Sequence, residues 1–533
     1  MNTWLVPLPV VIPLVAAGLT LALGGRSRLQ GIISAIAITL VVLASGALMY
    51  LAHHDGPQVV NVGEWSAPVG ISLIADRLSA LMLLISAIVL LCVLLYSLAQ
   101  GLADGNEGAP VAIYHPTYLV LAAGVANAFL TGDLFNLYVG FEILLGASFV
   151  LLTLGGTGER IRAGSIYVVV SLLSSVLFLI AIGLVYAATG TLNMAQLAER
   201  LGNIDPGMAL VLQVMLLLGF LIKAAVFPLS AWLPDSYPTA PAPVTAVFAG
   251  LLTKVGVYAI LRTQTLMFPE GRLDDVLLVA SIVTMLVGIV GAVAQDDLKR
   301  LLSFTLVSHI GYMIFGVALA NKAGLAAAIF YVAHHITVQT ALFLVSGLIE
   351  RRGGTTSLEN LGSLARLAPA LGVLFFIPAM NLAGIPPMSG FLGKVGLLQA
   401  GAELGTPLAY VGVAAGLLTS LLTLYAIVKA WNKAFWQEAP EPLPETSIPR
   451  SMFGPAAALA AVGLAFAVVG GPLSTYTASA ATDLQSRTPY VSAVLTNGDR
   501  GDGTSDEAAD DPTQDPSETE SATDDATDGG DDG

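Results

Sequence analysis

The sequence is poor in charged residues and contains a single cysteine. Only 11% of its 533 residues are charged, whereas a soluble globular protein carries roughly 25%. Hydrophobic residues make up 55% of the chain, and the mean hydropathy is +0.79. This composition excludes a soluble fold and predicts a chain that crosses the membrane many times. The one cysteine, Cys92, excludes an intrachain disulfide and a cysteine-ligated cluster.

The few charges are also unevenly distributed. The formal net charge is −15, but residues 501–533 hold thirteen of the 37 acidic residues and no lysine or arginine. The part of the chain before this segment is therefore much closer to neutral. Because the C-terminal region has little apolar surface to bury, residues 481–533 are predicted to form a disordered acidic tail.

Apolar runs of about 20 residues predict roughly fourteen transmembrane helices joined by short loops. An all-α polytopic membrane fold follows, with no soluble catalytic domain. The first run lacks a basic segment ahead of it, so we interpret it as a helix rather than a cleaved signal. The predicted spans are residues 4–23, 31–51, 75–99, 113–131, 134–154, 164–188, 207–232, 241–262, 275–294, 301–320, 325–349, 369–397, 404–431 and 452–472.

Basic residues predict the orientation of these spans. The positive-inside rule places the more basic set of loops in the cytoplasm, which puts both termini outside a cell membrane. The loop at 99–111 has no basic residue and is an exception. The cytoplasmic set is Arg26, Arg28, Arg160, Arg162, Lys299, Arg300, Arg351, Arg352, Arg366, Lys433 and Arg450; the opposite set is Arg200, Arg262, Arg272 and Lys322.

Proline interrupts two of the spans. Lys223 comes five residues before Pro228 in the seventh span, and Pro386 and Pro387 precede Lys394 in the twelfth. Proline removes a helix hydrogen bond, so each break leaves carbonyl groups that must be buried in protein or hydrated. The breaks lie five spans apart, and an odd offset inverts membrane orientation. Spans four to eight and nine to thirteen are therefore predicted to be inverted repeats, and paired broken helices point to a transport pathway.

This pattern divides the chain into five segments. Three N-terminal helices are followed by the first repeat, the second repeat, a last helix and the acidic tail. The predicted bounds are 1–111, 112–265, 266–435, 436–480 and 481–533.

Ionisable side chains are placed inside these spans. A charge in hydrocarbon is costly, so such residues persist mainly where they pair or line a water-filled path. The set falls near one depth, which predicts a polar axis parallel to the membrane plane that transfers protons. Its members are Glu142, Lys223, Lys254, His309, His334, His335 and Lys394.

Glu142 is the one acid deep inside a span and is predicted to be the counter-ion of Lys223. Burial favours the neutral lysine and a nearby carboxylate favours the charged form, so a neighbouring charge could switch Lys223. Asp133 and Asp235 are candidate accessory residues, although a helix N-cap and a loop contact are their structural alternatives.

The histidines are open to a second interpretation, since a buried histidine is often only a hydrogen-bonded core residue. A metal site is not expected, because His334 and His335 point about 100° apart on a helix and no inner carboxylate joins them. No cofactor is expected. Asp76 and Arg77 are expected to pair with each other at the membrane edge.

Several long motifs resemble the proton-conducting subunit family shared by respiratory complex I and the multi-subunit Mrp cation/proton antiporters. The resemblance covers roughly residues 1–475. The segments WLVPLPVVIPLVAAGLTLALG and GEWSAPVGISLIADRLSALMLL are most similar to the D-subunit branch of that family. The other motifs are TGDLFNLYVGFEIL, IKAAVFPLSAWLPDSYPTAPAPVTAVFAGLLTKVGVYAILRT, DDLKRLLSFTLVSHIGYM and LAGIPPMSGFLGK.

The resemblance implies a fourteen-helix fold in which Glu142, Lys223, Lys254 and Lys394 are the charged residues of helices five, seven, eight and twelve. It implies a proton-translocating subunit of a hetero-oligomeric Na⁺/H⁺ antiporter, a transporter subunit rather than an enzyme. The expected partners are the other subunits, protons, Na⁺ (or K⁺ or Li⁺) and the bilayer, without nucleic acid. The alternatives are a proton-pumping subunit of an NADH–quinone or hydrogenase-type complex, a single-chain transporter for an organic substrate, and a non-conducting scaffold.

Overall fold

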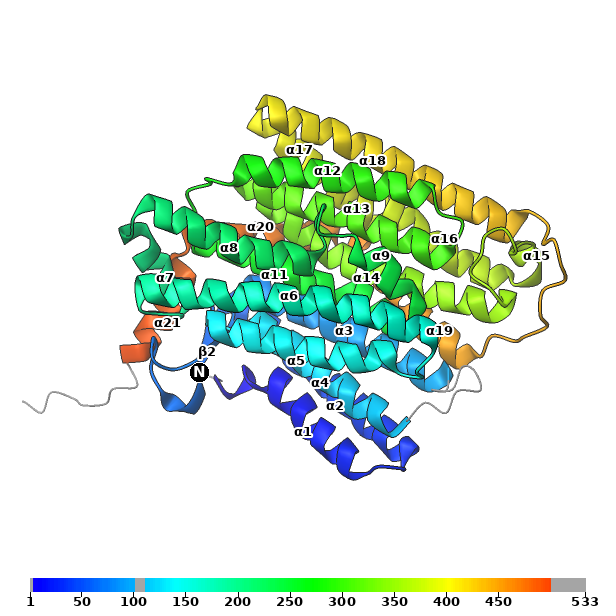
Figure 1. The fold of residues 1–533 in the computed structure, drawn as a ribbon, viewed down its shortest axis with the longest axis horizontal. Coiled ribbons are helices and arrows are strands. Elements are labelled where there is room, and N and C mark those ends of the chain that lie inside the picture. Colours follow the sequence, from blue (N-terminus) through cyan, green and yellow to red (C-terminus); the bar gives the residue numbers. More distant parts are fainter. Residues whose placement is uncertain (1–2, 101–110, 500–533) are drawn as a thin grey trace, which may run out of the picture.

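The computed structural model describes residues 3–100 and 111–499. Residues 500–533 of the predicted tail and residues 101–110 of the loop without basic residues lie outside the described residues. The helices form one bundle in which most axes run in nearly the same direction (Figure 1). The first half contains α1 (Leu8–Ala22), α2 (Ser27–His54), α3 (Arg77–Gln100), α4 (Val111–Leu130), α5 (Leu134–Thr153), α6 (Gly158–Thr189), α7 (Met194–Arg200), α8 (Pro206–Ala224), α9 (Trp232–Ser236), α10 (Ala242–Val247) and α11 (Thr253–Leu266).

The second half repeats the alternation of long apolar helices and short loops. It contains α12 (Asp274–Val293), α13 (Leu298–Ala318), α14 (Lys322–Gly353), α15 (Leu364–Leu367), α16 (Pro369–Ala383), α17 (Ser389–Leu404), α18 (Pro407–Trp431), α19 (Arg450–Val468), α20 (Gly470–Ser486) and α21 (Thr488–Asp499). Side-chain caps set the starts of α5, α6 and α13, because Asp133, Thr157 and Asp297 each accept a hydrogen bond from the first turn of the helix that follows.

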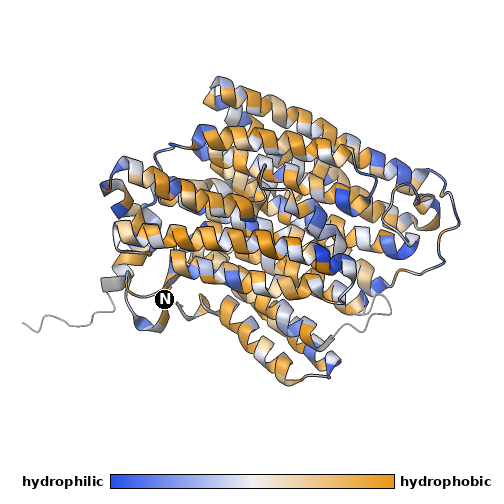
Figure 2. Ribbon diagram, viewed as in Figure 1, coloured by the Kyte–Doolittle hydropathy of each residue, from blue (hydrophilic) through white to orange (hydrophobic). Residues whose placement is uncertain are grey.

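The polytopic α-helical fold predicted from the apolar runs is confirmed. Twelve helices among the described residues are long and apolar enough to cross a membrane, and α1 and α16 are shorter apolar helices. The exact number of fourteen spans stays a prediction, as do the bounds of the repeats. The outer helices α6, α12 and α18 are hydrophobic along most of their length (Figure 2), and the side chains of Val169, Leu172 and Leu173 on α6 are exposed where lipid would lie.

A small antiparallel sheet marks one end of the bundle. Strands β1 (Gln58–Asn61) and β2 (Ser72–Ala75) pair with Gln58 opposite Ala75. We call the end that carries this sheet, α7 and α21 the hairpin end, on the left in Figure 1, and the opposite end, which carries Arg160 and Arg351, the basic end. The N-terminus and α21 lie together at the hairpin end.

Both predicted breaks are present. Helix α8 ends at Ala224, and Ala225 adopts a left-handed conformation with φ 59°. Helix α16 ends at Ala383, and Gly384 follows with φ 83°. A third irregularity separates α10 from α11, where residues 248–252 form a π-helical turn. Single π-helical turns within α-helices are frequent at functional sites, since they re-aim side chains and backbone carbonyls.

Helix α14 lies at the centre of the bundle and packs against α3, α10, α13, α16, α17, α19 and α20. Its apolar middle is completely buried, as is the α10–α11 span. These two spans carry His334, His335 and Lys254. These three residues of the predicted axis are therefore held inside the protein and shielded from lipid, whereas Glu142 on α5 is only partly buried.

The start of the predicted disordered tail was wrong. Residues 481–499 belong to α20 and α21, and Leu484, Tyr490 and Val494 are buried. The loss of apolar residues is gradual, and those that remain between 481 and 499 are spaced so that they pack against the hairpin end. The dense acidic composition starts only after this segment.

Candidate functional site

Glu142 and Lys223 meet through a third residue, Ser175. The Ser175 hydroxyl on α6 donates a hydrogen bond to Glu142 Oε1 on α5. Lys223 Nζ on α8 donates to the same hydroxyl oxygen at 3.0 Å and lies 3.4 Å from the Ser171 carbonyl oxygen. The Phe141 ring centroid lies 5.6 Å from Nζ. The predicted carboxylate–lysine pair is thus placed together, joined in the described structure by a shared hydroxyl.

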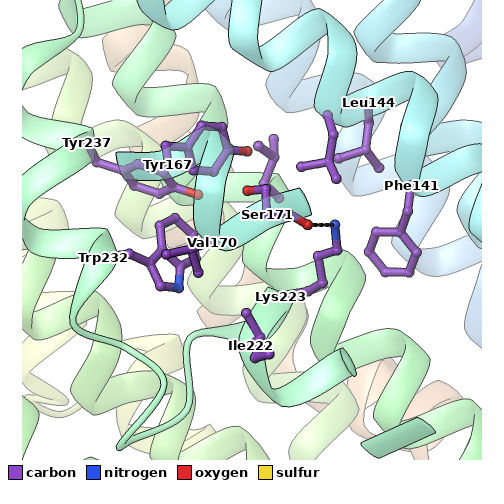
Figure 3. A pocket seen from close by; sticks show the side chains of 11 residues that line it. Phe141, Leu144, Tyr167, Val170, Ser171, Ile222, Lys223, Trp232 and Tyr237 are labelled. Carbon is purple, nitrogen blue, oxygen red and sulfur yellow. Dashed lines mark hydrogen bonds between the residues drawn. The ribbon is translucent and has the colours of Figure 1, made fainter. Parts of the chain in front are cut away.

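Lys223 borders a narrow cavity towards the basic end, shown in Figure 3. Its volume of about 20 Å³ suits one water molecule. Trp232 and Tyr237 line it, and the Trp232 Nε1 and Tyr237 Oη atoms are buried without a hydrogen-bond partner among the described residues. Such atoms ordinarily bind ordered water, so the cavity gives Lys223 a polar neighbour on the side away from Glu142.

Lys254 is fully buried on α11. Its Nζ donates a hydrogen bond to the Ala249 carbonyl oxygen in the π-helical turn. The Lys254 charge is within electrostatic reach of His309 and His335. The local break in the helix thus supplies the acceptor for an amine that forms no ion pair with a carboxylate among the described residues.

The three histidines form a cluster between α13 and α14. The rings of His309 and His335 have centroids 5.2 Å apart. His309 Nδ1 bonds to the Tyr331 hydroxyl at 2.8 Å, and His334 Nδ1 bonds to the Ser389 hydroxyl at 3.0 Å. Both His335 nitrogens and His334 Nε2 are buried without a partner among the described residues, and buried polar atoms of this kind ordinarily bind ordered water.

Lys394 is held by the broken end of α16. Its Nζ donates hydrogen bonds to the carbonyl oxygens of Leu382 and Ala383 at 3.0 and 2.9 Å, and to the Ser420 hydroxyl at 3.2 Å. These are the last carbonyls of α16, where the helix dipole concentrates partial negative charge. The Tyr312 ring lies 5.4 Å from Nζ. The break predicted from proline thus supplies the acceptors of a buried ammonium group.

The helices that carry Lys223 and Lys254 are closely packed against each other. A Cβ at Gly256 would lie 2.7 Å from the Ala224 backbone nitrogen and 3.0 Å from the Lys223 carbonyl carbon. The helix that carries Lys254 therefore touches the end of α8. From Glu142 to Lys394 the axis crosses α5, α6, α8, α11, α13, α14 and α17, which is a path across the bundle rather than along one helix.

The two accessory candidates lie apart from the axis. The Asp133 carboxylate accepts a hydrogen bond from the Asn136 backbone nitrogen at 2.9 Å and caps α5. Burial raises the pKa of this carboxyl, and the backbone bonds from Asn136 and Phe135 oppose the rise. Asp235 pairs with Arg300 at 2.8 Å on an exposed part of the basic end.

The expected pairing of Asp76 with Arg77 was wrong. Asp76 binds the Arg262 guanidinium with two hydrogen bonds of 2.7 and 2.8 Å, and Arg77 pairs with Asp483. Burial by itself would raise the pKa of Asp76, but Arg262 outweighs it and holds the pKa below its ordinary value. Neighbouring residues at a helix start point in different directions. Asp76 and Arg77 therefore each pair with a residue that is far away in the sequence.

Sequence reasoning missed the polar residues that connect the charged ones. Ser175, Tyr331, Ser389 and Ser420 each contact a charged or imidazole group of the axis. Their hydroxyls lie within apolar runs, and serine is common in membrane helices as a small packing residue. The sequence pattern alone therefore carried no signal that would single them out.

Comparison with known proteins places this arrangement in a class. Residues 131–423 match the model of the transmembrane NADH:quinone oxidoreductase/Mrp antiporter family. The fold resembles a chain in the Mrp complex from Dietzia sp. DQ12-45-1b, with a TM-score of 0.86, 34% identity, and coverage of 93% of this chain and 100% of that one. It also resembles a chain of respiratory complex I from Thermus thermophilus, with a TM-score of 0.78, 25% identity, and coverage of 90% and 99%. The protein belongs to this family of membrane subunits.

Within the family, the chain is similar to the D subunits of sodium/proton antiporters. It is 39% identical to the D subunit of the Na⁺/H⁺ antiporter of Alkalihalophilus pseudofirmus, over 92% of this chain and 99% of the relative. It is 38% identical to the corresponding D subunit of Bacillus subtilis, over 93% and 100%. The family resemblance noted in the sequence motifs is confirmed.

Proposed function

We propose that this protein is the proton-translocating membrane subunit of a multi-subunit Na⁺/H⁺ antiporter and acts as a transporter subunit rather than an enzyme. The observation that carries the proposal is the row of buried lysines and histidines that crosses the bundle from Glu142 to Lys394. The similarity to the D subunits of antiporters along nearly the whole chain supports it. In this proposal the chain lies in the cell membrane with the hairpin end, and both termini, outside.

The arrangement suits a sequence of proton transfers. When Glu142 is ionised and reaches Lys223 through Ser175, the charged lysine is favoured. When the carboxylate is neutralised or turns away, the buried ammonium loses that support and favours releasing its proton. Lys254, the histidine cluster and Lys394 provide the next acceptors. Protonation of Lys254 and Lys394 would alternate with that of the Glu142–Lys223 pair.

The donor set favours protons over sodium as the ion that travels here. Sodium is a hard cation that prefers several oxygen ligands. The axis offers one carboxylate, Glu142, which is engaged by Ser175, and its lysines repel a metal cation. The sodium route is therefore assigned mainly to partner subunits.

The same fold also occurs in respiratory complexes, so a proton-pumping subunit of an NADH–quinone or hydrogenase-type complex is the second candidate. The buried axis would serve both. Purification of the native complex separates them, because the antiporter assignment predicts small membrane subunits and the alternative predicts redox subunits as partners.

The test of the proposal is antiport in everted vesicles from an antiporter-deficient host that expresses the complete set of subunits. Glu142→Gln and Lys223→Ala should each abolish transport, and Glu142→Asp should keep part of it. The matched controls are Glu159→Gln and Lys322→Ala, which make the same chemical changes at exposed positions. Near-normal transport by either axis variant at normal complex abundance would refute the proposed pair.

A further inference from the structure

A second cavity lies at the hairpin end and differs from the one beside Lys223. It has a volume of about 510 Å³ and is formed between the end of α7, the start of α8 and the loop after α11. Its rim carries Glu270 and Arg272, which pair with each other. Arg487, which joins α20 to α21, also lines it and donates to the Ala198 and Leu266 carbonyl oxygens at 3.3 and 3.4 Å. Glu199 lines the cavity as well, so its wall carries charged groups of both signs and is polar.

The inner wall of this cavity contains a buried amide pair. Gln213 on α8 lines the cavity although the residue is only 2% exposed. Its Nε2 donates to Gln264 Oε1 on α11 at 2.6 Å. Gln264 Nε2 is buried without a hydrogen-bond partner among the described residues. An unpaired amide N–H next to a polar cavity is a place where water binds, because leaving the group dry is costly.

The two glutamines occupy the helices that carry the central lysines. Gln213 lies ten residues before Lys223 on α8, and Gln264 lies ten residues after Lys254 on α11. Ten residues of α-helix span about 15 Å. Helices α8 and α11 pack against each other, and between the two levels both carry buried apolar residues, among them Leu217 and Ile260. We call this contact the seam. Apolar constrictions of this kind conduct only when they are transiently hydrated.

We propose that this cavity is an aqueous vestibule through which protons reach the Lys223–Lys254 region from the hairpin end, and that the Gln213–Gln264 pair forms its inner end. The vestibule holds water, and the amide pair orders water at its inner end beside Gln264. Protons move along this water, and they reach the amine of Lys223 or Lys254 only when further water transiently bridges the seam. Hydration of the seam then gates the path. This inference rests on the proposed proton route. It adds that one end of the route opens at the hairpin end.

Cysteine labelling in the assembled complex tests the vestibule directly. In a Cys92→Ala background, Gln213→Cys should react with a membrane-impermeant charged thiol reagent in vesicles of one orientation only. Glu270→Cys at the rim marks the side, and Val214→Cys, on the adjacent outward-facing position of α8, should not react. Leu210→Cys, which also lines the cavity, replaces Gln213→Cys if that variant does not assemble. Labelling at the rim without labelling at either inner position would overturn the vestibule.

A second measurement tests whether the vestibule is on the proton route. Gln213→Met keeps the side-chain size but removes the amide, and it should lower antiport by about tenfold, the effect of one lost hydrogen bond on a conducting path. Val214→Met introduces the same residue one position along and should change antiport by no more than about twofold. Normal antiport in Gln213→Met would remove the cavity from the route. That result would not change the loss of antiport expected in the Glu142 and Lys223 variants. A failure of the vestibule can therefore be distinguished from a failure of the proposed proton route.

Discussion

Lys223 and Lys394 are both buried beside broken helices, but their ammonium groups are stabilised in different ways. Lys223 shares the Ser175 hydroxyl with a carboxylate. Lys394 is bound by two carbonyl oxygens at the end of α16 and by the Ser420 hydroxyl. A carboxylate can be neutralised by a proton, whereas a backbone carbonyl cannot. The first half therefore has a partner whose charge can change, and the second half has a fixed partial charge that holds a lysine in place.

Of the three substitutions that test this comparison, Gly384→Ala in the second half is expected to have the largest effect. Gly384 has φ 83°, and a Cβ there would lie 2.9 Å from Lys394 Cδ. Alanine would both strain the turn and push the ammonium group from its carbonyls. Leaving a buried charge without partners costs roughly 3–5 kcal/mol, so antiport should fall by about a hundredfold or more.

Gly183→Ala is the matched control, because a Cβ at Gly183 meets no atom within 4 Å. Antiport and the amount of assembled complex are measured for both variants. If Gly384→Ala transports normally, the fixed-carbonyl account of Lys394 is wrong.

Ser175→Ala should have the next largest effect. It leaves Glu142 and Lys223 in place but removes the hydroxyl that both contact. A hydrogen bond to a charged group contributes about 1.5–3 kcal/mol, so a loss of antiport of about tenfold or more is expected.

Ser165→Ala, on the exposed surface of the same helix, is the control for α6. A direct contact between Glu142 and Lys223 in the working protein would make Ser175 dispensable, and antiport of Ser175→Ala would then match that of Ser165→Ala.

Ser420→Ala should have the smallest effect of the three. Lys394 keeps its contacts with Leu382 and Ala383 when this hydroxyl is lost. Antiport should fall by only about twofold, because one of three hydrogen bonds is removed. The comparison of the two halves depends on Ser175→Ala being clearly more damaging than Ser420→Ala, as measured in the same vesicle assay. Equal losses would mean that the two lysines are stabilised alike.

Much of the architecture could be predicted because membrane insertion makes strict demands on local sequence. A span must be long and apolar, so the predicted run at 134–154 corresponds to α5 and the run at 275–294 to α12. Proline and glycine act within a few residues, so the breaks before Lys394 and after Lys223 could be located as well. Ionisable residues in such runs are conspicuous because so few are tolerated.

The sequence by itself therefore determined the membrane class, the helices and the charged members of the axis, since each depends on residues close together in the chain. The tertiary structure alone decided how those members are connected. Ser175 links α5 to α8, Asp76 pairs with Arg262 rather than with its neighbour, and residues 481–499 pack as helices. These contacts depend on which helix faces meet, and a buried polar group takes the partner that the packing presents to it.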